Sequence, residues 1–393
     1  MKKILIVNSN MQIGGIQKAL ANMLNKIEDQ FEIDLLLFDD QGALMRSVPP
    51  SVQLLPTNNK LRILGRGNRD CKRLGWQHYL LSCILRLYCV CRNNRRPIRI
   101  LLGKKKLQKK YDVAISFMQP GSTKFLYGGC AEFVLNNVDA VTKVAYIHCD
   151  YSKYAGNERL NTTLLSKFDK IACVSESCAN RFVAATNNTN CVMTAYNFAD
   201  YDSIRSLSCA KSVEYTDQLT HFVTVARLSQ EKGICETLPL VKKLVETGVT
   251  KFQWHIVGDG HLRSQIDEMI DTYDLSKYVI MHGATDNPYP YIKQASCMLI
   301  CSIHEAAPMV YEEAACLGTP ILTTKTCSST ELVVHKGYGI EVASQDVLFL
   351  QMKKIVMDNK YLDDYRDSLG KKEFTNKIPL AQFKRLVEDG NSK

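Results

Sequence analysis

Short apolar runs alternate with amphipathic stretches along the first half of the chain. The run from Lys3 to Asn8 predicts a β-strand, and after a Gly14-Gly15 turn the apolar positions from Ile16 to Ile27 recur at helical spacing. Further strands are predicted at Glu32–Phe38, Val52–Leu55, Val113–Phe117, Val141–His148, Lys170–Val174 and Cys191–Ala195, with a helix at Glu176–Ala185. Strands that alternate with helices indicate βαβ units and a parallel sheet.

A second series of the same kind follows a polar stretch at about Asp200–Gln218. Its predicted strands are Phe222–Ala226, Gln253–Val257, Val279–His282, Cys297–Cys301 and Pro320–Thr323. Its predicted helices lie within Gly233–Thr247 and at Leu262–Tyr273, Pro288–Ala295 and Pro308–Leu317, and the chain is helical in pattern from Asp346 on. The predicted fold class is therefore α/β, with two doubly wound, Rossmann-like domains.

The two series define the expected domains. We place the first at residues 1–199, with an insertion at about 60–110, and the second at 218–375, while 376–393 form a helix that could return to the first domain. We expect the two domains to face each other across a cleft, with the carboxyl ends of both sheets pointing inward. Ligands of open α/β sheets bind at those ends, so the loops that follow strands are the candidate site.

Length and composition agree with this picture. A chain of 393 residues is too long for one ordinary core. With 46% hydrophobic residues, 23% charged residues and a mean hydropathy of −0.15, wholesale disorder, collagen-like repetition and an integral membrane protein are disfavoured. The apolar stretch Leu80–Val90 contains Arg86 and is far shorter than the ~20 residues of a membrane span. The apolar run at the amino terminus is shorter than the ~7–15 residues of a signal-peptide core.

Cysteine usage indicates the compartment. The fifteen cysteines are an odd number, include no Cys-x-x-Cys pair and lack the spaced histidines that would complete a zinc site. Reduced thiols are typical of the cytosol, so we expect a cytoplasmic protein.

One segment carries the basicity of the chain. Residues 60–110 contain sixteen Lys or Arg and one acid, a net charge of +15, whereas the remainder sums to −5. Apolar residues recur among these cations near helical spacing: Trp76, Tyr79, Leu80, Ile84, Leu87 and Tyr88. Such a helix either lies on an anionic membrane surface, here the inner face of the cytoplasmic membrane, or packs its stripe on its own domain. No nucleic-acid reading motif accompanies the charge, so we expect no nucleic-acid partner.

Two loops of the second domain offer groups for a diphosphate. Arg227 follows the first strand and Lys232 comes five residues later, so both cations could converge at one strand-to-helix loop. Gly258 and Gly260 lie in the turn after the next strand, where the backbone could approach a ligand closely.

The loop before the Pro308 helix combines carboxylates with a helix amino terminus. Glu305 lies in the loop and Glu313 eight residues later inside the helix, and Pro308 suits the first turn. The free N–H groups at the start of the helix attract an anion, while carboxylates accept hydrogen bonds from sugar hydroxyls. Glu312 is the better candidate for a solvated face. A ligand with a sugar, a diphosphate and a second sugar would satisfy all of these groups, which describes a nucleotide sugar.

In this order the motifs resemble a known family. They are Ala226-Arg227-Leu228 with Lys232-Gly233, Ile256–Gly260, and Glu305-x7-Glu313 followed by Ala314-x3-Gly318-x-Pro320; in the first half Gly14-Gly15, Tyr146–Asp150, Val174–Glu176 and Tyr196–Phe198 also match. The chain resembles the retaining glycosyltransferases of the GT-B fold, family 4 (glycosyl transferases group 1), of the bacterial surface-polysaccharide type.

The resemblance implies roles residue by residue. Arg227 and Lys232 would bind the donor diphosphate, Glu305 the transferred sugar and Glu313 the ribose of the nucleotide. The backbone at Ala307, Pro308, Met309 and Val310 would meet the sugar and phosphates, and the loop at Gly283 and Ala284 the base. His148 follows an apolar strand and would contact the sugar, with a structural histidine as the competing interpretation. Gly14 and Gly15 would form an acceptor or phosphate loop, unless Gly15 serves only a turn with positive φ. Ala306 stands where the family usually has glycine, which affects the orientation of the donor sugar.

The predicted activity is transfer of a sugar from a nucleotide diphosphate donor to a hydroxyl of a lipid-linked saccharide in surface-polysaccharide biosynthesis, with retention. No metal or other cofactor is expected, because fixed cations and a helix amino terminus can neutralise the leaving diphosphate. Asp200 and Asp202 resemble a metal-binding pair, but that spacing is common by chance. The alternatives are a nucleotide-sugar epimerase of the same architecture and a binding module without turnover.

Overall fold

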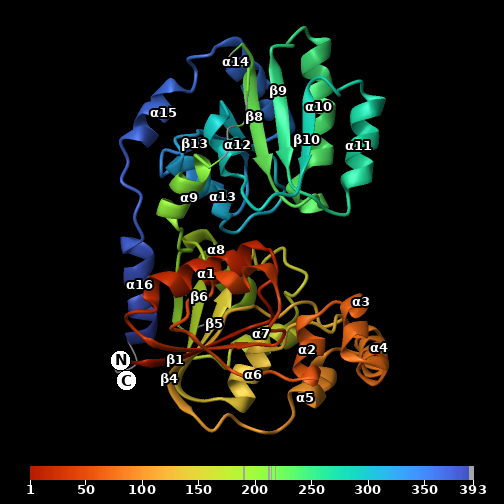
Figure 1. The fold of residues 1–393 in the computed structure, drawn as a ribbon, viewed down its shortest axis with the longest axis vertical. Helices are drawn as coiled ribbons and strands as arrows, with labels where there is room; N and C mark the ends of the chain where they lie inside the picture. The colour runs from red at the N-terminus through yellow and green to blue at the C-terminus, as the bar shows by residue number, and fades with distance from the viewer. Residues whose placement is uncertain (189–190, 211–212, 214, 217, 389–393) are drawn as a thin grey trace. The chain divides into compact units, whose positions relative to one another are not determined.

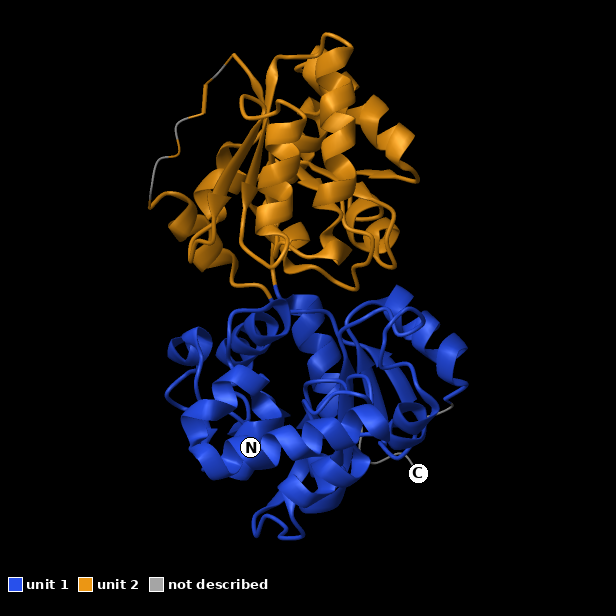
Figure 2. Ribbon diagram, turned by 90° about the vertical axis from the view of Figure 1, so that its right-hand side faces the viewer, with its two compact units in different colours: residues 1–198, 376–393 blue, residues 199–375 orange. Residues whose placement is uncertain are grey.

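The computed structural model describes residues 1–188, 191–210, 213, 215–216 and 218–388, and the chain divides into two compact units (Figures 1 and 2). Unit 1 contains residues 1–198 and 376–393, and unit 2 contains residues 199–375. Among the described residues, no helix combines the length and the apolar character needed to cross a bilayer.

Unit 1 is built on a seven-stranded parallel sheet in the order β3-β2-β1-β4-β5-β6-β7. The strands are β1 (Lys3–Asn8), β2 (Glu32–Leu37), β3 (Gln53–Leu54), β4 (Lys110–Ser116), β5 (Asp139–Ile147), β6 (Lys170–Cys173) and β7 (Cys191–Thr194). The helices outside the insertion are α1 (Gly15–Ile27), α6 (Cys130–Asn137), α7 (Arg159–Leu165), α8 (Glu176–Thr186) and α16 (Lys377–Glu388). The apolar residues of β1, from Ile4 to Val7, are fully buried, as expected for a central parallel strand.

The basic insertion folds as helices between β3 and β4. They are α2 (Asn59–Gly65), the short α3 (Asn68–Cys71), α4 (Trp76–Cys91) and α5 (Arg95–Leu102). Arg86 fixes α4 to the rest of unit 1, because its guanidinium donates to the backbone oxygens of Arg66 at 2.9 Å and Leu126 at 3.1 Å. The insertion is therefore an ordered part of unit 1.

Unit 2 has a six-stranded parallel sheet in the order β10-β9-β8-β11-β12-β13. The strands are β8 (Thr220–Val225), β9 (Phe252–Val257), β10 (Val279–Gly283), β11 (Cys297–Ile300), β12 (Ile321–Thr324) and β13 (Gly339–Val342). The helices are α9 (Tyr201–Ser208), α10 (Ile234–Glu246), α11 (Arg263–Thr272), α12 (Tyr289–Gln294), α13 (Met309–Cys316), α14 (Gln345–Met357) and α15 (Asp363–Gly370). The order reverses between β8 and β11, as in doubly wound sheets, and this confirms the predicted fold class.

The boundary between the units differs from the expected one. The stretch predicted as interdomain contains α9, which belongs to unit 2, where Tyr201 donates a hydrogen bond to Glu312 of α13 at 2.9 Å. The hydrophobic pattern did not predict this helix, because only Ile204 and Ser208 of α9 are buried and most of its other residues are exposed. Helix α16 lies in unit 1: Phe383 packs edge-on against Phe31, and Lys2 Nζ donates to the backbone oxygen of Val387 at 2.9 Å.

Candidate active site

The carboxyl ends of β8 and β11 bring a cation and a carboxylate together. Lys232 Nζ lies 2.6 Å from Glu305 Oε1, and Ser302 Oγ donates to the same oxygen at 2.7 Å. The two side chains are only 21% and 12% exposed. Two groups predicted separately, one for the diphosphate and one for the sugar, therefore form one partly buried ion pair.

Close backbone packing explains this proximity. Gly233 has a φ of +67°, and a Cβ there would lie 2.0 Å from the backbone oxygen of Cys301, at the end of β11. The N–H of Ile303 donates to the backbone oxygen of Glu231 at 2.9 Å. Since only glycine permits this approach, the Lys232-Gly233 pair of the sequence places the lysine beside the Glu305 loop.

Arg227 is placed differently. Its side chain is 72% exposed and lies 3.2 Å from Glu231, which also accepts a hydrogen bond from Ser229 at 2.6 Å. Burial raises the pKa of Glu231, but its hydrogen bonds and the charges of Arg227 and Lys232 outweigh burial and lower it overall. Glu231 therefore stays ionised beside both cations, and Arg227 has an open approach to an incoming anion.

Gly258 and Gly260 serve packing between loops. A Cβ on Gly258, which has a φ of +148°, would lie 1.8 Å from the backbone oxygen of Ala226, and one on Gly260 would lie 2.3 Å from that of Leu228. These two glycines thus permit close packing on the loop after β8, and their close approach to a ligand stays a prediction. These glycines fix the loop that carries Arg227.

Helix α13 begins at Met309, one residue later than predicted, so Pro308 is its N-cap and not a residue of its first turn. Ala307, Pro308 and Val310 are half-buried and Met309 is buried, so the amino terminus of the helix is partly accessible. It follows the Glu305 loop directly in the sequence. Glu313 is 2% exposed. Its contact with a ribose stays a prediction.

The expectation that Glu312 is solvated is wrong. Its carboxylate accepts hydrogen bonds from Lys336 Nζ at 2.6 Å, from Tyr201 at 2.9 Å and from Tyr338 at 3.3 Å. Burial and the nearby Glu312 charge raise the pKa values of both tyrosines, which keeps them as hydrogen-bond donors. Glu312 thus holds α9 and the segment before β13 against α13.

The Gly283–Ala284 loop offers open space after β10. Gly283 has a φ of +74°, and a Cβ there would meet no atom within 4 Å. The contact of this loop with a base stays a prediction.

In unit 1, His148 follows β5 and is half-buried. Its Nε2 lies 2.9 Å from the backbone oxygen of Phe117, so Nε2 carries the hydrogen and Nδ1 is the acceptor. Burial lowers the pKa of His148 to about 4, although the Phe117 carbonyl partly opposes this. The ring stacks on Tyr146 with centroids 5.6 Å apart. A neutral imidazole of this tautomer can accept a hydrogen bond from a hydroxyl.

Gly14 and Gly15 do not have positive φ, so the alternative of a left-handed turn is wrong. Gly14 is the extended N-cap of α1, and a Cβ on Gly15 would meet no atom within 4 Å. Gly15 therefore leaves space at the start of α1, where the free N–H groups of the helix lie.

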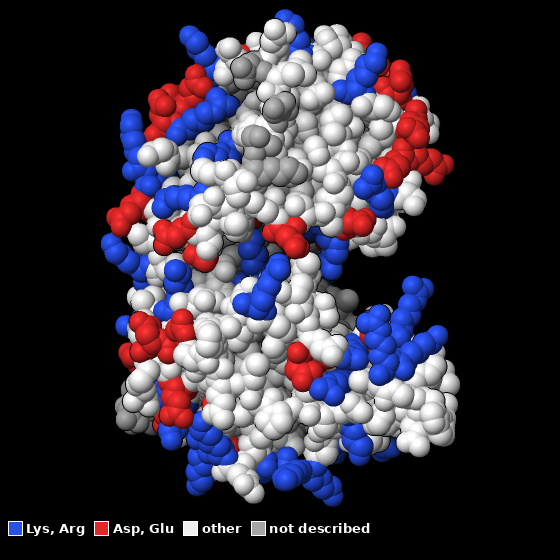
Figure 3. Space-filling view, viewed as in Figure 1, with Lys and Arg blue, Asp and Glu red and all other residues white. Residues whose placement is uncertain are grey.

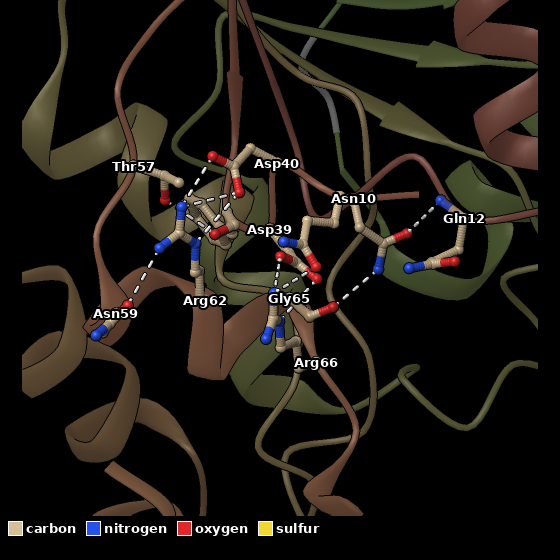
Figure 4. A network of polar contacts seen from close by, with 11 residues as sticks. Asn10, Gln12, Asp39, Asp40, Thr57, Asn59, Arg62, Gly65 and Arg66 are labelled. Carbon is tan, nitrogen blue, oxygen red and sulfur yellow. Dashed lines mark hydrogen bonds and ion pairs between the residues drawn. The ribbon is translucent and has the colours of Figure 1, made fainter. Parts of the chain in front are cut away.

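Sequence inspection missed a polar network beside this loop (Figure 4). Asn10 donates to the backbone oxygen of Gly65 at 2.8 Å and accepts from the N–H of Gln12 at 3.1 Å. Arg66 forms two hydrogen bonds of 2.9 and 2.8 Å with Asp39, and both side chains are nearly buried. Polar residues directly after β1 and β2 were the available signal, since such positions lie at the ligand-binding edge of a parallel sheet.

Asp200 caps α9 by accepting from Ser203 Oγ at 2.6 Å, which is a structural role. Within the described ranges, His, Cys, Asp and Glu side chains form no group of three or more arranged to hold a metal ion.

The two-domain α/β architecture is that of GT-B glycosyltransferases: a crystal structure of Anabaena HepE in complex with UDP and glucose superposes with a TM-score of 0.67 at 15% identity, over 99% of this chain and 100% of that chain. The sequence of unit 2 matches the family described as "Glycosyl transferases group 1" over residues 211–372.

Two sequence relatives match parts of the chain. An "uncharacterized glycosyltransferase" of Methanocaldococcus jannaschii is 24% identical over 147 residues, 37% of this chain and 36% of that protein. The N-acetylgalactosamine-N,N'-diacetylbacillosaminyl-diphospho-undecaprenol 4-alpha-N-acetylgalactosaminyltransferase of Campylobacter jejuni is 22% identical over 175 residues, 44% and 46% of the two chains. The matches thus span less than half the length of these relatives.

Proposed function

We propose that this protein is a retaining glycosyltransferase that moves a sugar from a nucleotide diphosphate sugar to a hydroxyl of a lipid-linked saccharide. The observation that carries the proposal is the Lys232–Glu305 ion pair at the carboxyl ends of β8 and β11, next in sequence to the amino terminus of α13. This ion pair places a cation that can bind a leaving phosphate next to a carboxylate that can accept hydrogen bonds from sugar hydroxyls.

The chemistry follows from these groups. The bond from the anomeric carbon to the diphosphate oxygen breaks, and the bond to the acceptor oxygen forms on the same face. The acceptor proton passes to the departing diphosphate, whose negative charge Lys232 and Arg227 stabilise. Glu305 orients the transferred sugar, and a sugar contact of His148 stays a prediction. We propose that this proceeds without a metal, since the two cations and the N–H groups of α13 supply the electrostatic stabilisation.

The function is tested by incubating the purified chain with a panel of nucleotide sugars and following thermal unfolding and sugar release, with and without excess chelator. A ligand at 100 times its dissociation constant stabilises a protein by about 2.7 kcal/mol. Arg227→Ala and Lys232→Ala should each weaken binding of the stabilising nucleoside diphosphate about tenfold or more, because each removes a charge-assisted contact.

Arg263→Ala is the matched control, since Arg263 is a partly exposed arginine of unit 2 paired with Asp267 on α11. Unchanged affinity in both site variants would remove Arg227 and Lys232 from the donor site. Activity that disappears in chelator and returns with magnesium or manganese would contradict the metal-free mechanism. An epimerase would instead convert the donor sugar without an acceptor, and a binding module would release no sugar.

The lipid-linked acceptor is supported by the surface of the insertion. The face of α4 that packs on unit 1 holds Ser82, Leu85 and Cys89. Its apolar ridge points outward instead, with exposed fractions of 73% for Trp76, 52% for Leu80, 57% for Ile84 and 67% for Leu87. Lys and Arg side chains gather around α3 and α4 (Figure 3). We propose that this ridge and its cations dock on an anionic bilayer, at the inner face of the cytoplasmic membrane.

The docking surface is tested by cosedimentation with liposomes of varied anionic lipid content and ionic strength. A variant with Arg96, Lys104, Lys105 and Lys106 changed to Gln should bind anionic vesicles more weakly, since each cation near the surface adds about 1 kcal/mol. Arg95 is left unchanged, because it bonds to Glu132 and Asn161 inside unit 1.

The control changes Lys251, Lys277, Lys360 and Lys371, which are exposed on unit 2, to Gln. Equal binding to neutral and anionic vesicles, or no binding, would contradict the docking proposal. The ridge would then be a surface without a membrane role.

A further inference from the structure

Three histidines on neighbouring strands of unit 2 form a hydrogen-bonded chain. His221 Nδ1 of β8 lies 2.9 Å from His255 Nε2 of β9, and His255 Nδ1 lies 3.0 Å from His282 Nε2 of β10. Strand alternation places them on the face opposite Phe222 and Trp254, which belong to the apolar core. The three hydrogen-bonded histidines thus form a row across three strands that ends at the edge of the sheet.

A backbone carbonyl sets the direction of this chain. His221 Nε2 lies 3.0 Å from the backbone oxygen of Thr216, which can only accept. Nε2 of His221 therefore carries the hydrogen, and in a neutral ring Nδ1 is then an acceptor. His255 therefore donates its Nε2 hydrogen to His221 Nδ1, which leaves His255 Nδ1 as an acceptor. In the same way His282 donates its Nε2 hydrogen to His255 Nδ1, which leaves His282 Nδ1 without a hydrogen.

The surroundings favour the neutral rings that this argument requires. Burial, followed by the neighbouring His221 and His282, lowers the pKa of His255 to about 3. Partial burial of its ring also lowers the pKa of His282. The Tyr215 ring stacks on His221 and on His255, with centroids 4.4 and 4.2 Å away. At pH 8 the last ring of the chain therefore presents a bare nitrogen.

His282, the last of the three histidines, is partly exposed. No hydrogen bond to its Nδ1 comes from the part of the chain that the structure describes. His282 precedes the open Gly283, at the carboxyl edge where ligands of parallel sheets bind. It lies two strands from β8, or about 10 Å from the loop with Arg227 and Lys232. This is the span from the diphosphate to the base of a nucleotide.

We propose that His282 Nδ1 reads the base of the donor and selects a ring nitrogen that carries a hydrogen. Uracil, thymine and guanine have such an N–H beside a carbonyl, whereas cytosine and adenine present a lone pair there, which the lone pair of Nδ1 opposes. His221 and His255 are positioning residues that hold the tautomer. The inference rests on the proposed function, because it requires a nucleotide donor.

UDP and CDP provide the sharpest test, since uracil and cytosine have the same size and differ at the ring nitrogen and its neighbouring substituent. We expect wild type to bind UDP about tenfold or more tightly than CDP at pH 8, since CDP leaves the acceptor unpaired. His282→Phe keeps a flat ring against Tyr291 and should bring the two affinities within about threefold. His335→Phe, an exposed histidine elsewhere in unit 2, should leave the ratio unchanged.

Nitrogen-15 NMR of the imidazoles gives a readout independent of binding. In wild type we expect an unprotonated Nδ1 at His282, and in His221→Phe a mixture of tautomers and a smaller UDP preference. A hydrogen on His282 Nδ1 in wild type, or a UDP preference retained in His282→Phe, would overturn the inference. If nucleotides bind but those whose base has a ring N–H (UDP, TDP and GDP) are not preferred over CDP and ADP, only this inference is overturned, whereas no binding of any nucleotide would also overturn the proposed function.

Discussion

Glu305→Gln should lower kcat about 100-fold or more while the protein keeps its fold. The amide retains the shape of the side chain and can still accept from Ser302, but it removes the charge that faces Lys232 at 2.6 Å. Loss of one preorganised electrostatic contact at a reacting centre typically costs a factor of about 10²–10³ in kcat. Steady-state kinetics with the identified donor and acceptor, together with thermal unfolding, would measure both effects.

The matched control is Glu246→Gln, which removes an exposed carboxylate 3.7 Å from Lys242 on α10. Surface ion pairs contribute about 0–1 kcal/mol, so neither turnover nor stability should change appreciably. If folded Glu305→Gln turned over at the wild-type rate, Glu305 would have no part in the reaction. A loss of stability without a loss of kcat would make the ion pair structural.

The regular elements were predictable because each carries its own periodicity. Fully apolar runs such as Ile4–Val7 are buried in the sheet on both faces, and a run of that kind in a βαβ context has few alternatives. Helix α6 was missed because six of its eight residues are buried, which leaves no separate apolar and polar faces, and α9 was missed because only two of its residues are buried. Both depend on packing against neighbours that a local pattern does not reveal.

Part of the site was predictable for a different reason. Lys232 and Glu305 follow strands of one parallel sheet, so their carboxyl-end position was fixed by the fold even though they lie 73 residues apart. The environment of Glu312 was not predictable, since its partners Lys336 and Tyr338 come from a segment with no motif. The three histidines escaped notice because each one, in its own strand, resembles an ordinary core residue. Only the strand order places them in contact.

Gly258→Ala should destabilise unit 2 strongly. Its Cβ would lie 1.8 Å from the backbone oxygen of Ala226, and the φ of +148° is one that alanine rarely adopts. Neither obstacle can be relieved by rotating a side chain, so the loops after β8 and β9 must separate. We expect a loss of about 4 kcal/mol or more, at the extreme of single substitutions, measured as a lower midpoint of thermal or urea unfolding.

Gly283→Ala separates the two contributions to that loss. Gly283 also has a positive φ, +74°, but a Cβ there meets no atom within 4 Å, so only backbone strain of about 1–2 kcal/mol is added. A much larger loss in Gly258→Ala than in Gly283→Ala would assign the difference to contact between the loops. If Gly258→Ala instead unfolded like wild type and lost only nucleotide affinity, the glycine would serve close approach of a ligand. The loop after β8 also carries Arg227. The expected outcome would therefore show that packing between the loops after β8 and β9 positions this arginine.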